Sequence, residues 1–304
     1  MKAMQHDIRK IRPHGFELKL ERTAYMFIAP AAVLLLVFNI LPMLASFWVS
    51  TQKMGVDIYS AEYIGLENYI KAFSDRRFIQ SFWINIRYTL IEVPLQMIIG
   101  VVFSALLAKN TTFNKLMRGI YFLPVVTSAV TVGVTWQLTL HSNIGIFTYW
   151  MKLLLGTSVN LLNDQATALY VVIFIAIWRT FGISTVILVA AIQKVPQDHY
   201  EAAELDGAGK IRQFWSITLP DIMPSFWFLM ITRFIGSLQI FDLIYTLTNG
   251  GPNKSTTTMV VYIFDTAFNK MNKMGYATAM SEVLFMMILV ISIAQYVIMN
   301  KTSD

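Results

Sequence analysis

The sequence predicts an all-α, polytopic membrane protein with six transmembrane helices and a helix-turn-helix loop on the cytoplasmic side. Of its 304 residues, 56% are apolar and only 14% are charged, whereas soluble proteins carry about 25% charged residues. Six apolar runs are long enough to cross a bilayer, which takes about 20 residues per helix. The lack of cysteine excludes a disulfide framework and thiolate chemistry.

The predicted transmembrane helices differ in polarity. The first carries no charge, and it is too long for a secretory signal sequence. Its prolines are expected to be tolerated, as they are in membrane helices generally. The fourth and fifth are the most polar. The six predicted helices cover residues 25–50, 82–107, 118–138, 168–192, 224–246 and 278–299.

The distribution of Lys and Arg sets the predicted topology. Thirteen lie at the two chain ends and in the second and fourth connections, and eight lie in the other three connections. By the positive-inside rule, both termini are cytoplasmic. We divide the chain into a basic, amphipathic segment, residues 1–24, and a transmembrane domain, residues 25–304. The segment either lies along the membrane surface or is a solvated tail, and the scattered charge gives no support for nucleic-acid binding.

A polar loop, residues 195–222, lies between the fourth and fifth predicted helices. Asp198 is expected to cap a short helix, because its carboxylate can accept a hydrogen bond from a free backbone N–H. Residues 199–205 would form about two turns. Gly207 then supplies the left-handed residue that ends this helix.

The second half of the loop is predicted to form another short helix, from Lys210 to Ile217. Leu219 and Pro220 are expected to end it, because proline removes a backbone donor. Pro224 is expected to begin the fifth transmembrane helix, since proline is tolerated in a first turn. The loop would then be a compact hairpin below the membrane.

The same loop carries a specific motif. Glu201-Ala202-Ala203, followed by Gly207 and then by Ile217-Thr218-Leu219-Pro220, resembles the EAA loop of the membrane subunits of binding-protein-dependent ABC importers. Most of the chain also resembles the carbohydrate-uptake permeases of the maltose-transporter membrane-subunit type. This wider resemblance is carried by Tyr63-Ile64-Gly65-Leu66-Glu67-Asn68-Tyr69, Leu123-Pro124, Trp178 and Leu247-Thr248-Asn249-Gly250-Gly251-Pro252.

The resemblance implies a membrane subunit of an ATP-driven importer of a sugar or oligosaccharide, in the bacterial inner membrane. In the family, the EAA loop docks on a cytoplasmic ATPase and couples ATP hydrolysis to helix movement. The implied partners are a second permease in a heterodimer, two ATPase subunits that bind ATP and Mg²⁺, and an extracellular or periplasmic solute-binding protein. The implied coupling residues are Glu201, Ala202, Ala203, Asp206, Gly207, Ile217, Leu219 and Pro220.

The chain itself is not expected to be an enzyme or to bind a cofactor or metal. A phosphate-binding loop needs G-x-x-x-x-G-K-S/T. The nearest match ends at Lys210 and has Glu204 in place of the first glycine and Ile211 in place of the hydroxyl residue. The four histidines show no metal-ligand spacing, so ATP hydrolysis is assigned to partner subunits.

Ionisable side chains within the predicted helices are candidates for the solute path, because a charge at mid-bilayer costs about 2.5–3.5 kcal/mol. Arg179 and Arg233 could bind the carboxylates of an acidic, uronate-containing oligosaccharide through paired hydrogen bonds. Alternatively, they pair with Glu92, Asp242 or an acid of a companion subunit. Glu92 and Arg87 are interpreted as structural. By resemblance, the candidate path residues are Arg179, Thr180, Arg233, Ser237, Gln239 and Asp242.

Two other functions are compatible with the sequence. The EAA loop serves many solute classes, so an importer permease for a non-sugar solute is the nearest alternative. A secondary transporter working alone would also have six helices with buried arginines. Co-purification of an ATPase, lost on substitution of Glu201 or Gly207, would separate an ABC importer from such a transporter.

Overall fold

The computed structural model describes residues 14–303, except 56, 58, 60, 157–159, 270 and 271. Residues 1–13 of the predicted N-terminal segment therefore lie outside the described residues. Apart from a short antiparallel hairpin of β1 (Gln52–Lys53) and β2 (Glu62–Tyr63), the regular structure in the described chain is helical. The α-helices are α2 (His14–Leu35), α3 (Leu41–Ser50), α4 (Glu67–Ser74), α5 (Arg76–Leu107), α6 (Thr112–Val126), α7 (Ala129–Thr139), α8 (Ile146–Leu155), α9 (Ala168–Ile192), α10 (Gln197–Leu205), α11 (Lys210–Gln213), α12 (Leu219–Leu238), α13 (Asp242–Thr248), α14 (Met259–Phe264) and α15 (Met274–Ser303). π-Helical turns occur at Leu36–Ile40, Phe214–Thr218 and Asp265–Asn269.

Five helical stretches of the described chain are long and apolar enough to cross a membrane. The first joins α2, a π-helical turn and α3. The fourth predicted helix is confirmed with its bounds unchanged, as α9. The first and second are confirmed with longer N-terminal ends, and the sixth is confirmed with both ends longer. The five stretches are Arg22–Ser50, Arg76–Leu107, Ala168–Ile192, Lys210–Leu238 and Met274–Lys301.

The third predicted helix, residues 118–138, is wrong as a single straight span. Two helices, α6 and α7, occupy this region and are bent by 95° relative to each other. The chain turns at Thr127 and Ser128, directly after the last turn of α6, which contains Pro124. Pro124 has no N–H to donate to the preceding turn, and this weakens the helix there. Counting the bent pair as one span gives six spans.

The fifth predicted helix, residues 224–246, is wrong at both ends. Its counterpart α12 ends at Leu238, and α13 begins as a separate helix. The break is stabilised by Asn85 of α5, which is fully buried. The Asn85 amide donates to the carbonyl of Leu238, and its side-chain oxygen accepts from the N–H of Met259. Because free backbone groups in an apolar environment need such partners, Asn85 allows α12 to end inside the protein.

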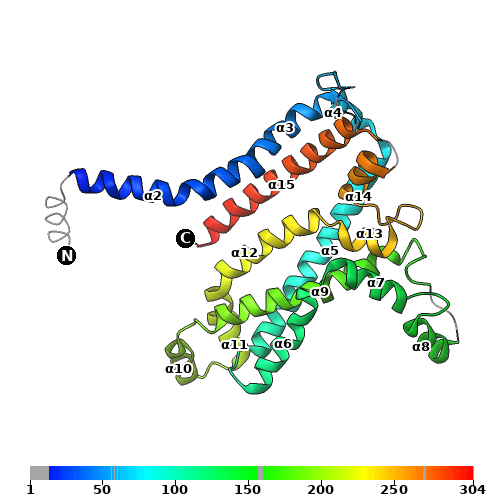
Figure 1. Ribbon diagram of the computed structural model, residues 1–304. Helices are drawn as coiled ribbons and strands as arrows, with labels where there is room; N and C mark the ends of the chain where they lie inside the picture. The colour runs from blue at the N-terminus through cyan, green and yellow to red at the C-terminus, as the bar shows by residue number, and fades with distance from the viewer. Residues whose placement is uncertain are drawn as a thin grey trace.

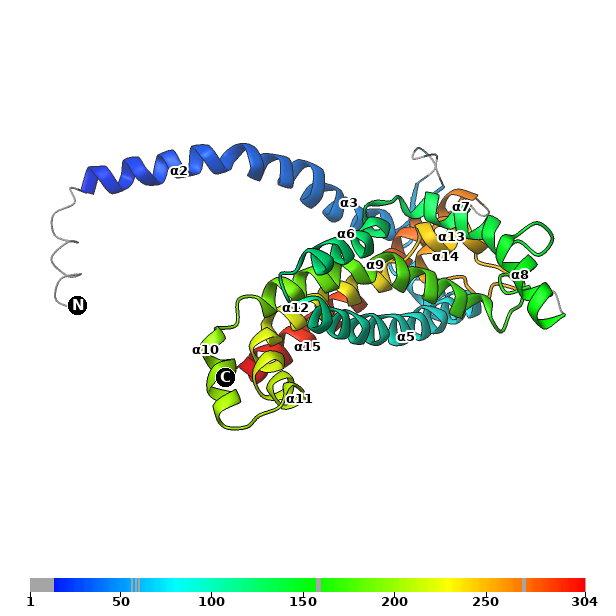
Figure 2. The same ribbon diagram turned by 90° about the horizontal axis from the view of Figure 1, so that it is seen from below.

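The centre of the molecule is formed by α5, α9 and α12, with α6 against α9 and α3 against α15 (Figure 1). The contact between α6 and α9 is close at Gly182, where a Cβ atom would lie 2.1 Å from the carbonyl oxygen of Tyr121. Only glycine fits without a shift of the backbone. By contrast, α2 extends away from this body in both views (Figures 1 and 2), and its described side chains are exposed.

The molecule has two functional ends. The beginning of α2 and the C-terminal end of α15 lie on the same side as α10 and α11, which we call the hairpin end (Figures 1 and 2). The opposite side carries α4, α7, α8, α13 and α14, and we call it the distal end. The three central helices connect the two ends.

Candidate functional site

The loop between α9 and α12 folds into the predicted helical hairpin. Gly207 follows α10 with a φ of +76°, the left-handed conformation that was predicted. The N–H of Ala208 donates to the carbonyl of Ala203 at 2.8 Å and closes the end of α10. The hydroxyls of Tyr200 and Thr218 lie 2.8 Å apart and hold α10 against the following helix. The hairpin is therefore one folded unit.

Three details of the hairpin correct the prediction. Pro196, and not Asp198, occupies the N-cap of α10; Asp198 lies in the first turn, where its charge still favours the helix N-terminus. The second helix does not end at Pro220, because α11 continues through a π-helical turn into α12. Pro220 lies in the first turn of α12, where its missing N–H is tolerated, and Pro224 lies inside the same helix. One helical rod of 29 residues results.

The hairpin presents exposed apolar side chains to its surroundings. Leu205, at the end of α10, is 90% exposed, and Ile211 and Trp215 are also exposed. Beside them, Lys210 forms an ion pair with Glu204, and this hydrogen bond lowers the pKa of Glu204. Contiguous exposed apolar groups are typical of surfaces that contact another protein or a membrane. Of the predicted coupling residues, the exposed ones are Glu201, Ala202, Asp206, Gly207 and Pro220, and the partly buried ones are Ala203, Ile217 and Leu219.

A row of buried polar side chains runs along α5. Their spacings of four, three and four residues place them on one helical face. Each is at most 1% exposed, and their partners lie mainly on α9 and α12. Thr89 accepts a hydrogen bond from Ser237 of α12 at 3.0 Å, and Gln96 donates to Ser184 of α9 at 3.2 Å. We call this row the polar spine; it consists of Asn85, Thr89, Glu92 and Gln96.

An ion pair joins the polar spine to the other two central helices. Nη2 of Arg233 lies 2.9 Å from Oε1 of Glu92 and 2.9 Å from Oγ1 of Thr180. The side chain of Glu92 is 1% exposed and that of Arg233 is 20% exposed. From the sequence, pairing with Glu92 was one alternative to the binding of a solute carboxylate by Arg233. The structure contains this pairing. Glu92, interpreted from the sequence as a structural residue near one end of its helix, is central to the cluster.

Arg179 belongs to the same cluster but is not paired in the same way. Within the described part of the chain it forms no ion pair, and its Nε is buried without a hydrogen-bond partner. Arg179 directly precedes Thr180, the partner of Arg233 on α9. This part of the central helices therefore carries two guanidinium groups and one carboxylate, which leaves one positive charge in excess.

The remaining predicted path residues lie in different places. Ser237 is buried against the polar spine, as described above. Gln239 caps the C-terminal end of α12, and Asp242 lies in the first turn of α13. Both side chains are exposed, and neither shares a helix turn with Arg233. The structure therefore separates Gln239 and Asp242 from the charge cluster by the break after α12.

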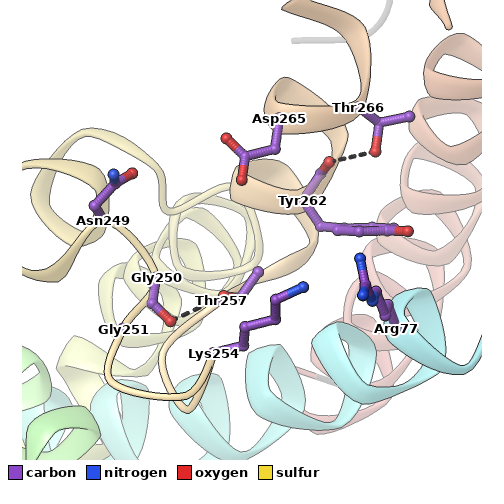
Figure 3. A pocket seen from close by; sticks show the side chains of 9 residues that line it. All are labelled: Arg77, Asn249, Gly250, Gly251, Lys254, Thr257, Tyr262, Asp265 and Thr266. Carbon is purple, nitrogen blue, oxygen red and sulfur yellow. Dashed lines mark hydrogen bonds between the residues drawn. The ribbon is translucent and has the colours of Figure 1, made fainter. Parts of the chain in front are cut away.

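A small cavity of about 110 Å³ lies at the distal end, beside the turn formed by residues 249–251 (Figure 3). Arg77 of α5 and Lys254 of the following loop approach it from one side, and Asp265 lies on the other. Thr257 donates from its hydroxyl to the carbonyl of Gly250 at 2.9 Å and holds the turn closed. The cavity is lined by both signs of charge.

Asp75 is the polar centre next to this cavity. It accepts hydrogen bonds from the hydroxyls of Tyr262 at 2.7 Å and Tyr276 at 2.8 Å, and it caps α5 by accepting from the N–H of Arg77. Burial acts to raise the pKa of Asp75, but these hydrogen bonds together lower it below its ordinary value. The carboxylate thereby ties α5, α14 and α15 together at the distal end.

Apolar helices long enough to cross a membrane, with charged side chains buried between them, define a polytopic membrane protein. Residues 97–303 match the family described as the inner membrane component of binding-protein-dependent transport systems. The chain belongs to this family and is a permease subunit of an ABC importer, not itself an enzyme.

Relatives of similar length support this membership. The trehalose/maltose transport system permease protein MalF of Thermococcus litoralis is 32% identical over 269 residues, which cover 88% of this chain and 90% of that one. The probable ABC transporter permease protein YurN of Bacillus subtilis is 30% identical, with 89% and 94% covered. The sn-glycerol-3-phosphate transport system permease protein UgpA of Shigella flexneri is 26% identical, with 90% and 92% covered.

Two solved structures share the fold. A bacterial ABC transporter involved in the import of the acidic polysaccharide alginate has a chain that matches with a TM-score of 0.84 at 20% identity, over 95% of this chain and 98% of that one. A bacterial alginate ABC transporter in complex with an alginate pentasaccharide-bound periplasmic protein matches with a TM-score of 0.80 at 19% identity, over 96% and 98%. At these identities the likeness establishes the fold.

Proposed function

We propose that the hairpin of α10 and α11 is the docking surface for an ATPase subunit, and that the hairpin end faces the cytoplasm. The exposed Leu205, Ile211 and Trp215 support a protein contact there. The excess of Lys and Arg in residues 1–24 and in the hairpin loop supports the orientation. In this proposal a second permease and two ATPases complete the importer, and an extracytoplasmic binding protein delivers the solute to the distal end.

Gly207 provides a test of the docking surface, with Gly209 as the matched control. Gly207 has a φ of +76° and Gly209 a φ of −70°, and nothing lies within 4 Å of a Cβ atom built at either position. Alanine adds only one methyl group at either position, and at 207 it is unfavourable only because of the left-handed backbone. We expect Gly207→Ala to lower the ATPase activity that the loaded binding protein stimulates in the purified complex, and Gly209→Ala to leave it unchanged. Equal activity of the two variants would contradict the proposal.

We propose further that the solute is a sugar or oligosaccharide with a carboxylate, and that Arg179 binds this carboxylate. The single observation that carries this is the Arg179 guanidinium, which lies next to Thr180 of the Arg233–Glu92 cluster and has a buried Nε without a hydrogen-bond partner in the described chain. Glu92 neutralises Arg233, whereas Arg179 forms no ion pair within the described chain. A guanidinium at this depth is costly without a counter-charge, and a carboxylate passing through would supply one.

The named solutes of the relatives differ in charge. MalF is named for trehalose and maltose, which are neutral, and UgpA for sn-glycerol 3-phosphate, which is an anion. The fold neighbour is described as importing an acidic polysaccharide. Since a phosphate would also pair with Arg179, a small organic phosphate is the second candidate solute, and it is favoured by the same excess charge.

Transport of a uronate oligosaccharide and of its methyl ester tests the role of Arg179. The ester removes the charge and keeps the rest of the sugar. The assay uses proteoliposomes that contain the complete importer. We expect Arg179→Gln to reduce transport of the free acid about ten- to hundred-fold, which corresponds to the free energy of one charge-assisted hydrogen bond. Transport of the ester should change little. Arg76→Gln, at the exposed first residue of α5, is the control and should affect neither. Equal loss of acid and ester with Arg179→Gln would overturn the proposal.

A further inference from the structure

Helix α8 carries a row of apolar side chains that the described chain leaves uncovered. Spacings of three and four residues place them on one face of the helix. Each is between 54% and 74% exposed. The other face is held against the protein: Thr148 is 5% exposed, and its hydroxyl lies 3.5 Å from the carbonyl of Leu140. We call the row the α8 stripe; it consists of Ile146, Tyr149, Trp150, Leu153 and Leu154.

The position of α8 is fixed by the bent pair of apolar helices that precedes it. Only six residues separate the end of α7 from the beginning of α8. The N–H of Gly145 donates to the carbonyl of His141 at 2.9 Å within this short connection. Both views place α8 at the distal end, on the side opposite the hairpin (Figures 1 and 2). When the bent pair of α6 and α7 is counted as one membrane span, this short connection places α8 near the level at which that span leaves the bilayer.

We propose that α8 is an interfacial helix, with its stripe inserted at the boundary between headgroups and acyl chains; the leaflet is the outer one in the orientation proposed above, on which this detail rests. Tyr149 and Trp150 have the amphipathic rings that are enriched at this level of a membrane. Lys152 is the only charged residue of α8, and a cation on the polar face suits anionic lipid headgroups. We infer that lipid covers the stripe because α8 directly follows the membrane span; the apolar stripe alone would not identify what covers it. The helix thereby anchors the distal end of the bent pair to the bilayer surface.

Spin labelling tests the proposal directly, because the chain contains no cysteine. Single variants Trp150→Cys and Leu153→Cys place a label in the stripe, and Lys152→Cys places the matched control at an exposed position outside the stripe. The labelled chain is reconstituted in nanodiscs as the complete importer, with cysteine-free partner subunits and without the binding protein. Electron paramagnetic resonance then measures the access of molecular oxygen, which dissolves in lipid, and of a water-soluble nickel chelate.

We expect both stripe labels to be several-fold more accessible to oxygen than to the nickel chelate, and the Lys152→Cys label to show the reverse. Stripe labels as accessible to the chelate as the control would show that the stripe faces water. Stripe labels protected from both reagents would show that a companion subunit covers it. Either result overturns the proposal. Leu154→Cys, at the most exposed position of the stripe, replaces any stripe variant that fails to assemble on size-exclusion chromatography.

Discussion

The ion pair between Glu92 and Arg233 makes a quantitative prediction about stability. Glu92→Gln removes one charge and leaves the guanidinium of Arg233 in a site where the pair is largely buried. Removal of one member of a buried pair costs about 3–5 kcal/mol, because the remaining charge is uncompensated. Arg233 retains its hydrogen bond to Thr180 and is 20% exposed, so we expect a value near the lower limit, about 3 kcal/mol. This corresponds to more than a hundred-fold in the unfolding equilibrium.

The double variant separates charge pairing from packing. Replacing both members of a buried pair with neutral groups of similar size is often neutral. We therefore expect the combination of Glu92→Gln with Arg233→Met to be more stable than Glu92→Gln alone. The coupling between the two substitutions should amount to about 2 kcal/mol, within the range found for residues in contact.

Unfolding of the purified chain in mixed micelles, with an increasing fraction of denaturing detergent and followed by circular dichroism, provides the measurement. Arg76→Gln is the control, since substitution at this exposed first residue of α5 should change stability by less than about 0.5 kcal/mol. If the effects of Glu92→Gln and Arg233→Met simply add, the two side chains do not depend on each other. The reasoning from the 2.9 Å contact would then be refuted.

Two further predictions concern the packing of α6 and the distal end. Gly182→Ala should destabilise the chain by about 1–3 kcal/mol, because the new Cβ atom would collide with the Tyr121 carbonyl. Gly119→Ala is the control: nothing lies within 4 Å of its Cβ atom, so it should be neutral or stabilising in the same unfolding assay. Equal effects of the two substitutions would contradict the close contact. Asp75 should contribute stability that is complete above the ordinary aspartate pKa of about 3.9 and is lost as the pH falls through its lower folded-state pKa. We therefore expect the difference in unfolding free energy between the unmodified chain and Asp75→Asn to shrink when unfolding curves are measured from about pH 6 down to about pH 3. A constant difference would show that the carboxylate charge has no role.

Much of the fold could be predicted because hydropathy and turn chemistry act locally. The apolar run at residues 168–192 has the same bounds in the structure as in the sequence. Gly207 adopts the left-handed conformation that its place after α10 required. Both features depend on a few neighbouring residues and on no distant contact.

The helix breaks could not be predicted in the same way. An apolar run crosses the 95° bend between α6 and α7 without interruption, so hydropathy gives no sign of it. The signal that was available is Pro124, followed by Thr127 and Ser128. The end of α12 depends on Asn85, which lies 153 positions away from Leu238 in the chain, and no local pattern indicates that contact.

The polar spine lies between these two cases. Its regular spacing is visible in the sequence, because four polar residues recur on one face of an otherwise apolar helix. The partners of those residues depend on how α9 and α12 pack against α5, and this is a tertiary property. The sequence therefore indicates that Arg233 is a buried charge, but only the structure shows that it pairs with Glu92 and not with an acidic residue of a companion subunit.

The unbroken rod of α11 and α12 has a mechanical consequence. Its 29 residues follow a path of about 43 Å at a rise of about 1.5 Å per residue, and neither Pro220 nor Pro224 interrupts the helical chain. If an ATPase docks at the hairpin as proposed, this helix connects its docking surface to Arg233 without an intervening loop. A displacement of the hairpin would therefore act on the contact between Arg233 and Glu92.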